Sequence, residues 1–150
     1  MVPVKITRKL NKQELERILT SRDGPVAKAL LVRGYRVQAQ ARKNLGGGTG
    51  SGPKRVDTGR LRASIAVELR RGPKGLAVRV GTNVTYAIYV HEGTGIYGKN
   101  ARPITPKTKR FLRFKVKGTQ RYVYALEVKG MRGNPFLVKA LPAARLGGAV

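Results

Sequence analysis

The sequence is poor in the residues on which most catalytic and metal-binding sites depend. It contains no cysteine, one histidine and seven acidic residues in a chain of 150. Without cysteine there is no disulfide bond, no thiolate metal ligand and no thiol nucleophile. A metal centre needs three or four converging ligands, and the carboxylates that could supply them are scattered along the chain. We therefore expect no catalytic residue, no metal and no cofactor, and the composition argues against an enzyme, a nuclease included.

Long apolar segments are also absent. No run of about 18 apolar residues occurs, so we expect no transmembrane helix and no membrane partner. Residues 1–6 lack the apolar core of a secretory signal, so we expect the chain to stay in the compartment where it is made. The length, with 41% hydrophobic residues, suits one domain over residues 1–150 with one core.

Positive charge is what the chain has in excess. It carries 32 Lys and Arg residues, and its formal net charge is +25. Such a charge destabilises a compact protein unless an anionic partner lies nearby. Residues 25–56 and residues 93–126 contain basic side chains and no acidic one. Acid-free basic segments are typical of a surface that faces nucleic acid or an acidic protein, the alternative being a solvated face that only aids solubility.

Two helices are predicted near the N-terminus. Asn11 and Glu14 have the spacing of a capping box, which starts a helix that ends near residues 21–23. Pro25 suits the first turn of a second helix, which runs to about Asn44. One side of the second helix is apolar, and it comprises Val26, Ala27, Leu30, Leu31, Gly34, Val37 and Ala41.

Strands are predicted further along the chain. A flexible glycine-rich linker over residues 44–56 leads to a capped turn and then to alternating apolar residues over 63–69 and 76–80, which are joined by a turn over 70–75. Residues 85–91 fit a short helix slightly better than a strand.

The C-terminal half adds a long loop, a second pair of strands and a helix. Residues 93–109 contain two prolines and many cations, and they are expected to form an extended basic loop or arm. Residues 110–116 and 122–128 are predicted strands, and Asn134 and Pro135 start a short last helix. The predicted fold class is α+β, with N-terminal helices, a small antiparallel sheet of about four strands, a C-terminal helix and long basic loops.

Three short strings of residues, in order along the chain, carry a family resemblance. They are residues 56–65 (VDTGRLRASI), residues 80–94 (VGTN, then YAIYVHEGT) and residues 134–141 (NPFLVKAL). Together, and behind an amphipathic helix, they resemble the minor tail-component family of long-tailed bacteriophages, also called neck or tail-completion proteins. The resemblance spans residues 57–141.

The resemblance implies a structural virion protein without catalytic role. Such a head–tail connector is made in the host cytoplasm and assembles as a homo-oligomeric ring where the DNA-filled head meets the tail, against neighbouring connector and tail proteins. The motif residues are expected to be scaffold, with Phe136 and Leu141 anchoring the last helix to the sheet and Tyr86 and Tyr89 burying their rings. The motif residues are Asp57, Thr58, Gly59, Leu61, Tyr86, Tyr89, Glu92, Gly93, Thr94, Pro135, Phe136 and Leu141.

A second set of residues is expected to face packaged double-stranded DNA in the ring lumen, or an acidic partner. These candidates are Arg33, Arg36, Lys43, Lys99, Arg102, Lys107 and Lys109. No base-reading motif is present, so any DNA contact would be with phosphates and would weaken steeply with salt. A non-specific nucleic-acid-binding protein is the alternative function, which explains the charge but not the three strings. His91 and Glu92 are interpreted as turn or subunit-contact residues.

Overall fold

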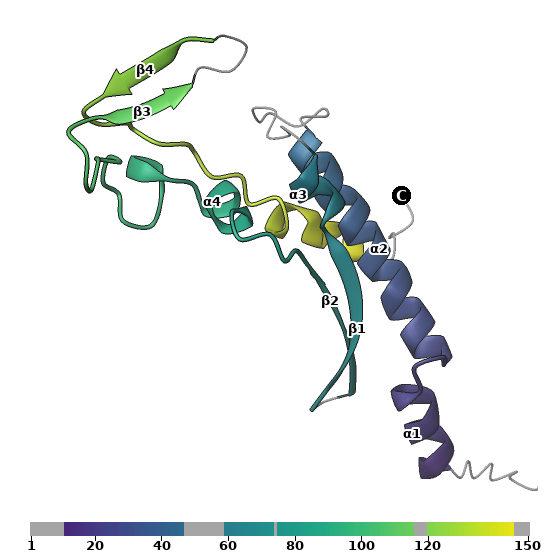
Figure 1. Cartoon of the computed structure of the whole chain (residues 1–150). Coiled ribbons are helices and arrows are strands. Elements are labelled where there is room, and N and C mark those ends of the chain that lie inside the picture. Colours follow the sequence, from purple (N-terminus) through teal and green to yellow (C-terminus); the bar gives the residue numbers. More distant parts are fainter. Residues whose placement is uncertain (1–10, 47–58, 74, 116–119, 146–150) are drawn as a thin grey trace, which may run out of the picture.

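The protein is an elongated α+β molecule (Figure 1). The structure is a computed structural model, which describes residues 11–46, 59–73, 75–115 and 120–145. The predicted α+β class is confirmed. In chain order the elements are α1 (Lys12–Thr20), α2 (Pro25–Gly46), α3 (Arg60–Ala63), β1 (Ala66–Gly72), β2 (Gly75–Gly81), α4 (Ala87–Glu92), η1 (Gly95–Tyr97), β3 (Leu112–Lys115), β4 (Tyr122–Ala125) and η2 (Val138–Ala144).

Helices α1 and α2 begin where the sequence predicts. The Asn11 side chain accepts a hydrogen bond from the Gln13 amide (3.2 Å) and so caps α1. Pro25 is the first residue of α2, which continues to Gly46. The predicted linker over residues 44–56 is therefore wrong for residues 44–46, which are helical, and its remainder lies outside the described residues.

A two-stranded antiparallel hairpin, β1–β2, lies along α2 (Figure 1). Its ladder pairs Val67 with Val80 and runs on to pair Gly72 with Gly75. The turn is therefore shorter than the one predicted over residues 70–75. The first strand begins at Ala66, later than the predicted start at residue 63, because residues 60–63 form α3. Helix and hairpin approach each other closely at Gly34, where an added Cβ would lie 2.6 Å from Val78 Cγ1.

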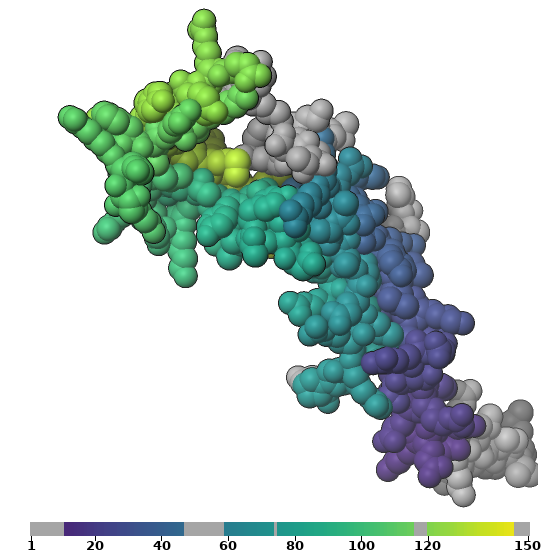
Figure 2. All heavy atoms as spheres, in the orientation of Figure 1, coloured from purple at the N-terminus to yellow at the C-terminus, as the bar shows by residue number. Residues whose placement is uncertain are grey.

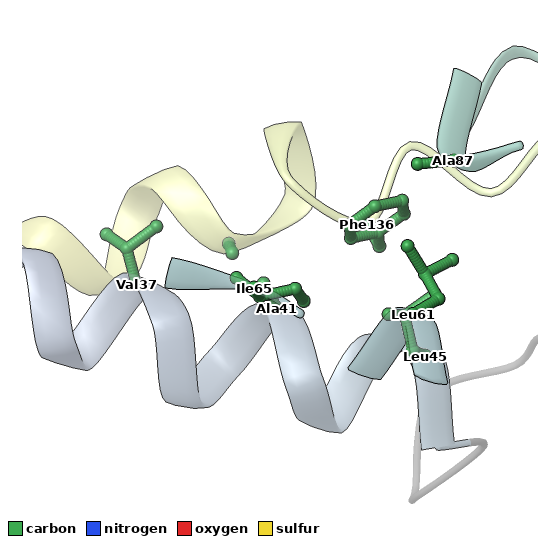
Figure 3. Packing of buried hydrophobic residues seen from close by; sticks show 8 residues of the cluster. Val37, Ala41, Leu45, Leu61, Ile65, Ala87 and Phe136 are labelled. Atoms are coloured by element: carbon green, nitrogen blue, oxygen red, sulfur yellow. The ribbon is translucent and has the colours of Figure 1, made fainter. Parts of the chain in front are cut away.

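The hydrophobic core lies where α2, α3, α4 and η2 meet. Phe136, Leu45 and Ile65 are the largest fully buried side chains. Figure 3 shows Phe136 among the side chains of Leu45, Leu61 and Ala87. The third string therefore packs against the same core as α2. The core is small, since the rest of its buried members are Val37, Ala41 and Ala140.

The C-terminal element differs from the predicted helix. It is a 3₁₀ helix, η2, that begins at Val138 and contains Pro142, whose missing amide hydrogen weakens an α-helical ladder. It packs against α2. Ala140 is buried there, whereas Leu141 is 59% exposed. The prediction that Leu141 anchors the last helix to the sheet is therefore wrong, because Leu141 borders an open groove beside α2 and β2 and is not buried in the core as Ala140 is.

The second pair of strands stands apart from the first. β3 and β4 form their own antiparallel hairpin, in register from Leu112 opposite Ala125 to Lys115 opposite Tyr122. The four strands therefore lie in two separate sheets rather than the single sheet predicted, because residues 93–109 carry the chain away from α2 first. We call residues 94–115 and 120–132 the arm; it projects beyond α4 (Figures 1 and 2).

Candidate assembly surfaces

Glycine and threonine of the second string hold the base of the arm. Gly93 has a φ of 94°, and an added Cβ would come within 2.9 Å of the backbone of Tyr97, Met131 and Gly133. The Thr94 amide donates to the Met131 carbonyl (2.8 Å), and the Thr94 hydroxyl accepts from the Met131 amide (2.9 Å). The outgoing and returning chains are thus joined at the point where they leave the core.

The basic segment over residues 93–109 is less extended than predicted. It contains the 3₁₀ turn η1 and pairs with the returning chain at Ile104, which exchanges two backbone hydrogen bonds with Val128 (2.8 and 2.9 Å). The Ile96 amide also donates to the Lys129 carbonyl (2.9 Å). The arm is therefore a hydrogen-bonded structure along part of its length.

The first string forms a bend between the long helix and the first hairpin. Gly59 precedes α3 with a left-handed φ of 78°, and Leu61 is buried in the core. The hydroxyls of Ser64 and Thr82 lie 2.6 Å apart and join this bend to the second string. Asp57 and Thr58 lie outside the described residues.

Two asparagines whose side-chain amides connect the third string to α2 were not predicted from the sequence. The buried Asn134 amide group donates to the Asn44 carbonyl (3.1 Å), and the Asn44 amide group donates to the Phe136 carbonyl (3.0 Å). The half-buried Pro135 lies between Asn134 and Phe136 in sequence. Only Asn134 gave a signal, as the start of the Asn-Pro string, because Asn44 was placed in the linker.

The tyrosines of the second string are not buried. Tyr86 and Tyr89 are exposed at α4, together with Ile88 and Glu92. This corrects the expectation that their rings are packed inside the chain. His91, by contrast, packs edge to face against Phe136, with the ring centroids 5.5 Å apart. This packing against the core gives His91 a structural role, and no catalytic role is needed to account for it.

The predicted polyanion-facing cations fall into two groups on different parts of the molecule. Arg36 and Lys43 are exposed on α2, whereas Arg33 is half-buried. The other four lie on the arm, beyond α4 from the long helix (Figure 1), and all are exposed: Lys99, Arg102, Lys107 and Lys109.

Arg33 lies in an apolar groove rather than on a basic face. The groove holds about 340 Å³ and is lined from α2, β2 and η2, with Val78, Leu137 and Leu141 among its residues. The Arg33 Nε is buried and has no hydrogen-bond partner among the described residues. Arg42, nine residues further along α2, joins the helix to the residue before β1, because its guanidinium donates to the Ile65 carbonyl (3.0 Å).

The hairpin β3–β4 has a basic and aromatic face that sequence reasoning did not single out. Arg113 lies opposite Tyr124, and Lys115 lies opposite Tyr122, so all four side chains share one face. The Arg113 guanidinium lies 3.9 Å from the centroid of the Tyr122 ring, at cation–π distance. The alternation of side chains in the two predicted strands placed Arg113 with Lys115, and Tyr122 with Tyr124, on one face of each strand. The sequence did not show the register that brings these cations opposite the tyrosines.

Comparison with protein families gives one match. Residues 5–93 match the family model described as "Bacteriophage HK97-gp10, putative tail-component". The match covers more than half of the 150 residues. The chain belongs to this phage tail-component family. Searches of the curated proteins and of the solved structures found no match.

Membership confirms the resemblance drawn from the three strings. The matched residues of this tail component include the first string, all of the second string except Thr94, α2 and the β1–β2 hairpin, while the arm beyond Gly93 and the third string lie outside the match. As a phage tail component, the chain is a structural protein of the virion. Among the described residues, no group of three or more metal-ligating side chains could hold a metal ion. In the same ranges no helix is long and apolar enough to cross a membrane.

Proposed function

We propose that this tail component is a head–tail connector or tail-completion protein that forms a homo-oligomeric ring at the head–tail junction. We assign it no catalytic role. The observation that carries the proposal is the number of large apolar and aromatic side chains left in solvent. In the described residues nineteen such side chains are exposed, against nine buried hydrophobic residues.

Apolar surface on this scale favours a protein that completes its structure by assembly. Contiguous exposed apolar patches mark interaction sites in soluble proteins. A two-stranded hairpin is marginally stable by itself, yet neither β3 nor β4 contains a buried residue. Helix α1 contains none either. A closed ring would cover both, since each copy in a ring uses two different surfaces to contact its two neighbours.

We propose that the positive charge serves to bind anionic partners and has no part in catalysis. The net charge of +25 favours a position beside packaged DNA or acidic neighbour proteins. We place the exposed cations of α2 and of the arm at the DNA path, with phosphate contacts that do not depend on sequence. A structure of the assembled ring with Arg36, Lys43 and Lys107 all on the outer rim would contradict this part.

A phage with an early stop codon in this gene tests the function. Electron microscopy of the lysate should show full heads and separate tails, or tails of abnormal form. The intact gene supplied in trans should restore joined particles, which controls for effects on neighbouring genes. Normal infectious particles without this protein would overturn the proposal.

The competing function is a non-specific nucleic-acid-binding protein, which the same charge favours. It requires that the isolated chain bind duplex DNA with a Kd well below micromolar at physiological salt. A connector, which acts at high local concentration in the particle, needs no such affinity. Tight duplex binding together with normal particles from the stop-codon phage would therefore support the competitor.

A further inference from the structure

Helix α1 has an apolar stripe that the described residues of its own chain cover only in part. Leu15, Ile18 and Leu19 have the i, i+3, i+4 spacing of one helix face, and they are 41%, 46% and 45% exposed. The helix touches α2 and β2 but contains no buried residue. A short helix gains most of its stability from the packing of its apolar face against other elements, so the exposed part of this stripe is a candidate docking surface.

Two glutamates flank the stripe in a strongly basic protein. At 100° per residue, Glu14 lies next to Ile18 on one side of the stripe, and on the other side Glu16 lies beyond Leu19, with Lys12 between them. Within the described part of the chain neither glutamate takes part in an ion pair. With Asp23, the two glutamates make three of the seven acidic residues within ten positions. Helix α1 thus carries two glutamates and two basic residues, so its formal charge is zero in a chain of +25, and its glutamates can meet a basic surface.

The hairpin β3–β4 offers the complementary surface at the other end of the molecule. Its face of Arg113, Lys115, Tyr122 and Tyr124 contains no acidic residue, and none occurs over residues 93–126; Glu127 is the first one after Tyr124. The rings of Tyr122 and Tyr124 are 50% and 62% exposed. Arginine and tyrosine are the residues most enriched in the energetic centres of protein interfaces.

We infer that α1 of one copy docks on this face of β3–β4 of the next copy in the ring. The apolar stripe of α1 then covers the tyrosine rings, and Glu14 and Glu16 meet Arg113 and Lys115. This inference rests on the proposed ring, and the two surfaces are those through which each copy contacts its two neighbours.

Geometry supports the same pairing. The two surfaces lie at opposite ends of the elongated chain (Figures 1 and 2), so a single copy cannot join them by a small movement, whereas a neighbour can. A helix of nine residues is about 13 Å long. A strand of four residues spans about 13 Å, so helix and hairpin match in length. The contact is heterologous, the kind that generates rings when its rotation closes.

Disulfide cross-linking tests the contact directly, because the chain has no cysteine of its own. Full-length protein carrying Glu16→Cys and Lys115→Cys is oxidised and analysed on non-reducing gels. Since each copy then carries one cysteine on each surface, the expected product is a ladder of multimers that ends at the ring. Each single-cysteine variant should stop at dimers.

The matched control moves the cysteine to the opposite side of α1. Gln13→Cys with Lys115→Cys should cross-link at least ten-fold more slowly, because Gln13 faces away from the stripe. Equal rates for the two double variants would overturn the contact. So would a cross-link from Lys115→Cys to a different virion protein in purified particles.

Charge reversal separates this contact from the ring itself. Glu14→Lys with Glu16→Lys, or Arg113→Glu with Lys115→Glu, should raise the concentration for half-assembly at least ten-fold, and all four changes together should restore most of the loss. Circular dichroism confirms that each variant is folded. Rings that form equally well in every variant would overturn the contact while the ring stands. A wild-type chain that is monomeric both at high concentration and in the particle would overturn both.

Discussion

Gly34→Ala is expected to weaken the seating of α2 on the first hairpin. An added Cβ would lie 2.6 Å from Val78 Cγ1 and 2.7 Å from Val67 Cγ1, whereas carbon atoms in contact lie about 3.5–4.0 Å apart. Valine is stiff at χ1, so the overlap of about 1 Å must be relieved by moving the helix. Overpacking of this kind costs about 1–3 kcal/mol, against a gain of about 1 kcal/mol from alanine in a helix.

Gly46→Ala in the same helix is the matched control. Its added Cβ would meet only the Arg62 guanidinium at 3.8 Å, an ordinary contact. Denaturant unfolding followed by far-UV circular dichroism should therefore give Gly34→Ala a free energy of unfolding about 1–3 kcal/mol below that of Gly46→Ala. A Gly34→Ala protein as stable as the control, or more stable, would refute the close packing of α2 against β1–β2.

The core, the arm and the charge each give a further prediction. Phe136→Ala should lower the free energy of unfolding by about 3–5 kcal/mol in the same assay, because a fully buried ring is lost; a loss below about 1 kcal/mol would contradict its central place. Gly93→Ala should speed hydrogen exchange in the arm, because its Cβ meets backbone atoms on both chains at the base, while Gly81→Ala, with open space around it, should not. Arg36→Glu with Lys43→Glu should weaken duplex binding and reduce its salt slope by about 2, and an unchanged slope would place α2 away from the phosphates.

Local signals predicted the N-terminal half of the fold well. The Asn11 cap and Pro25 specified where α1 and α2 begin, and apolar alternation located the strands of both hairpins. These features depend on neighbours within a few residues, which the sequence displays directly. The buried positions Val37 and Ala41 followed from the 3.6-residue period for the same reason.

Long-range features could not be read from such patterns. Whether four strands make one sheet or two depends on where residues 93–109 lead the chain, and the pairing of Ile104 with Val128 shows no local signal. The Asn44–Asn134 pair joins residues 90 positions apart. The exposure of Tyr86 was missed because an aromatic motif residue looks the same in sequence whether it packs inside the chain or awaits a partner.

A reconstruction of the neck of the intact phage particle by electron cryomicroscopy would show the proposed ring and its contacts together. We expect this chain to form a closed ring at the head–tail junction, with α1 of each copy against the β3–β4 hairpin of the next and the exposed cations of α2 and the arm toward the DNA path. Density for the chain elsewhere in the particle, or at the junction as isolated copies with no contact between neighbours, would contradict it.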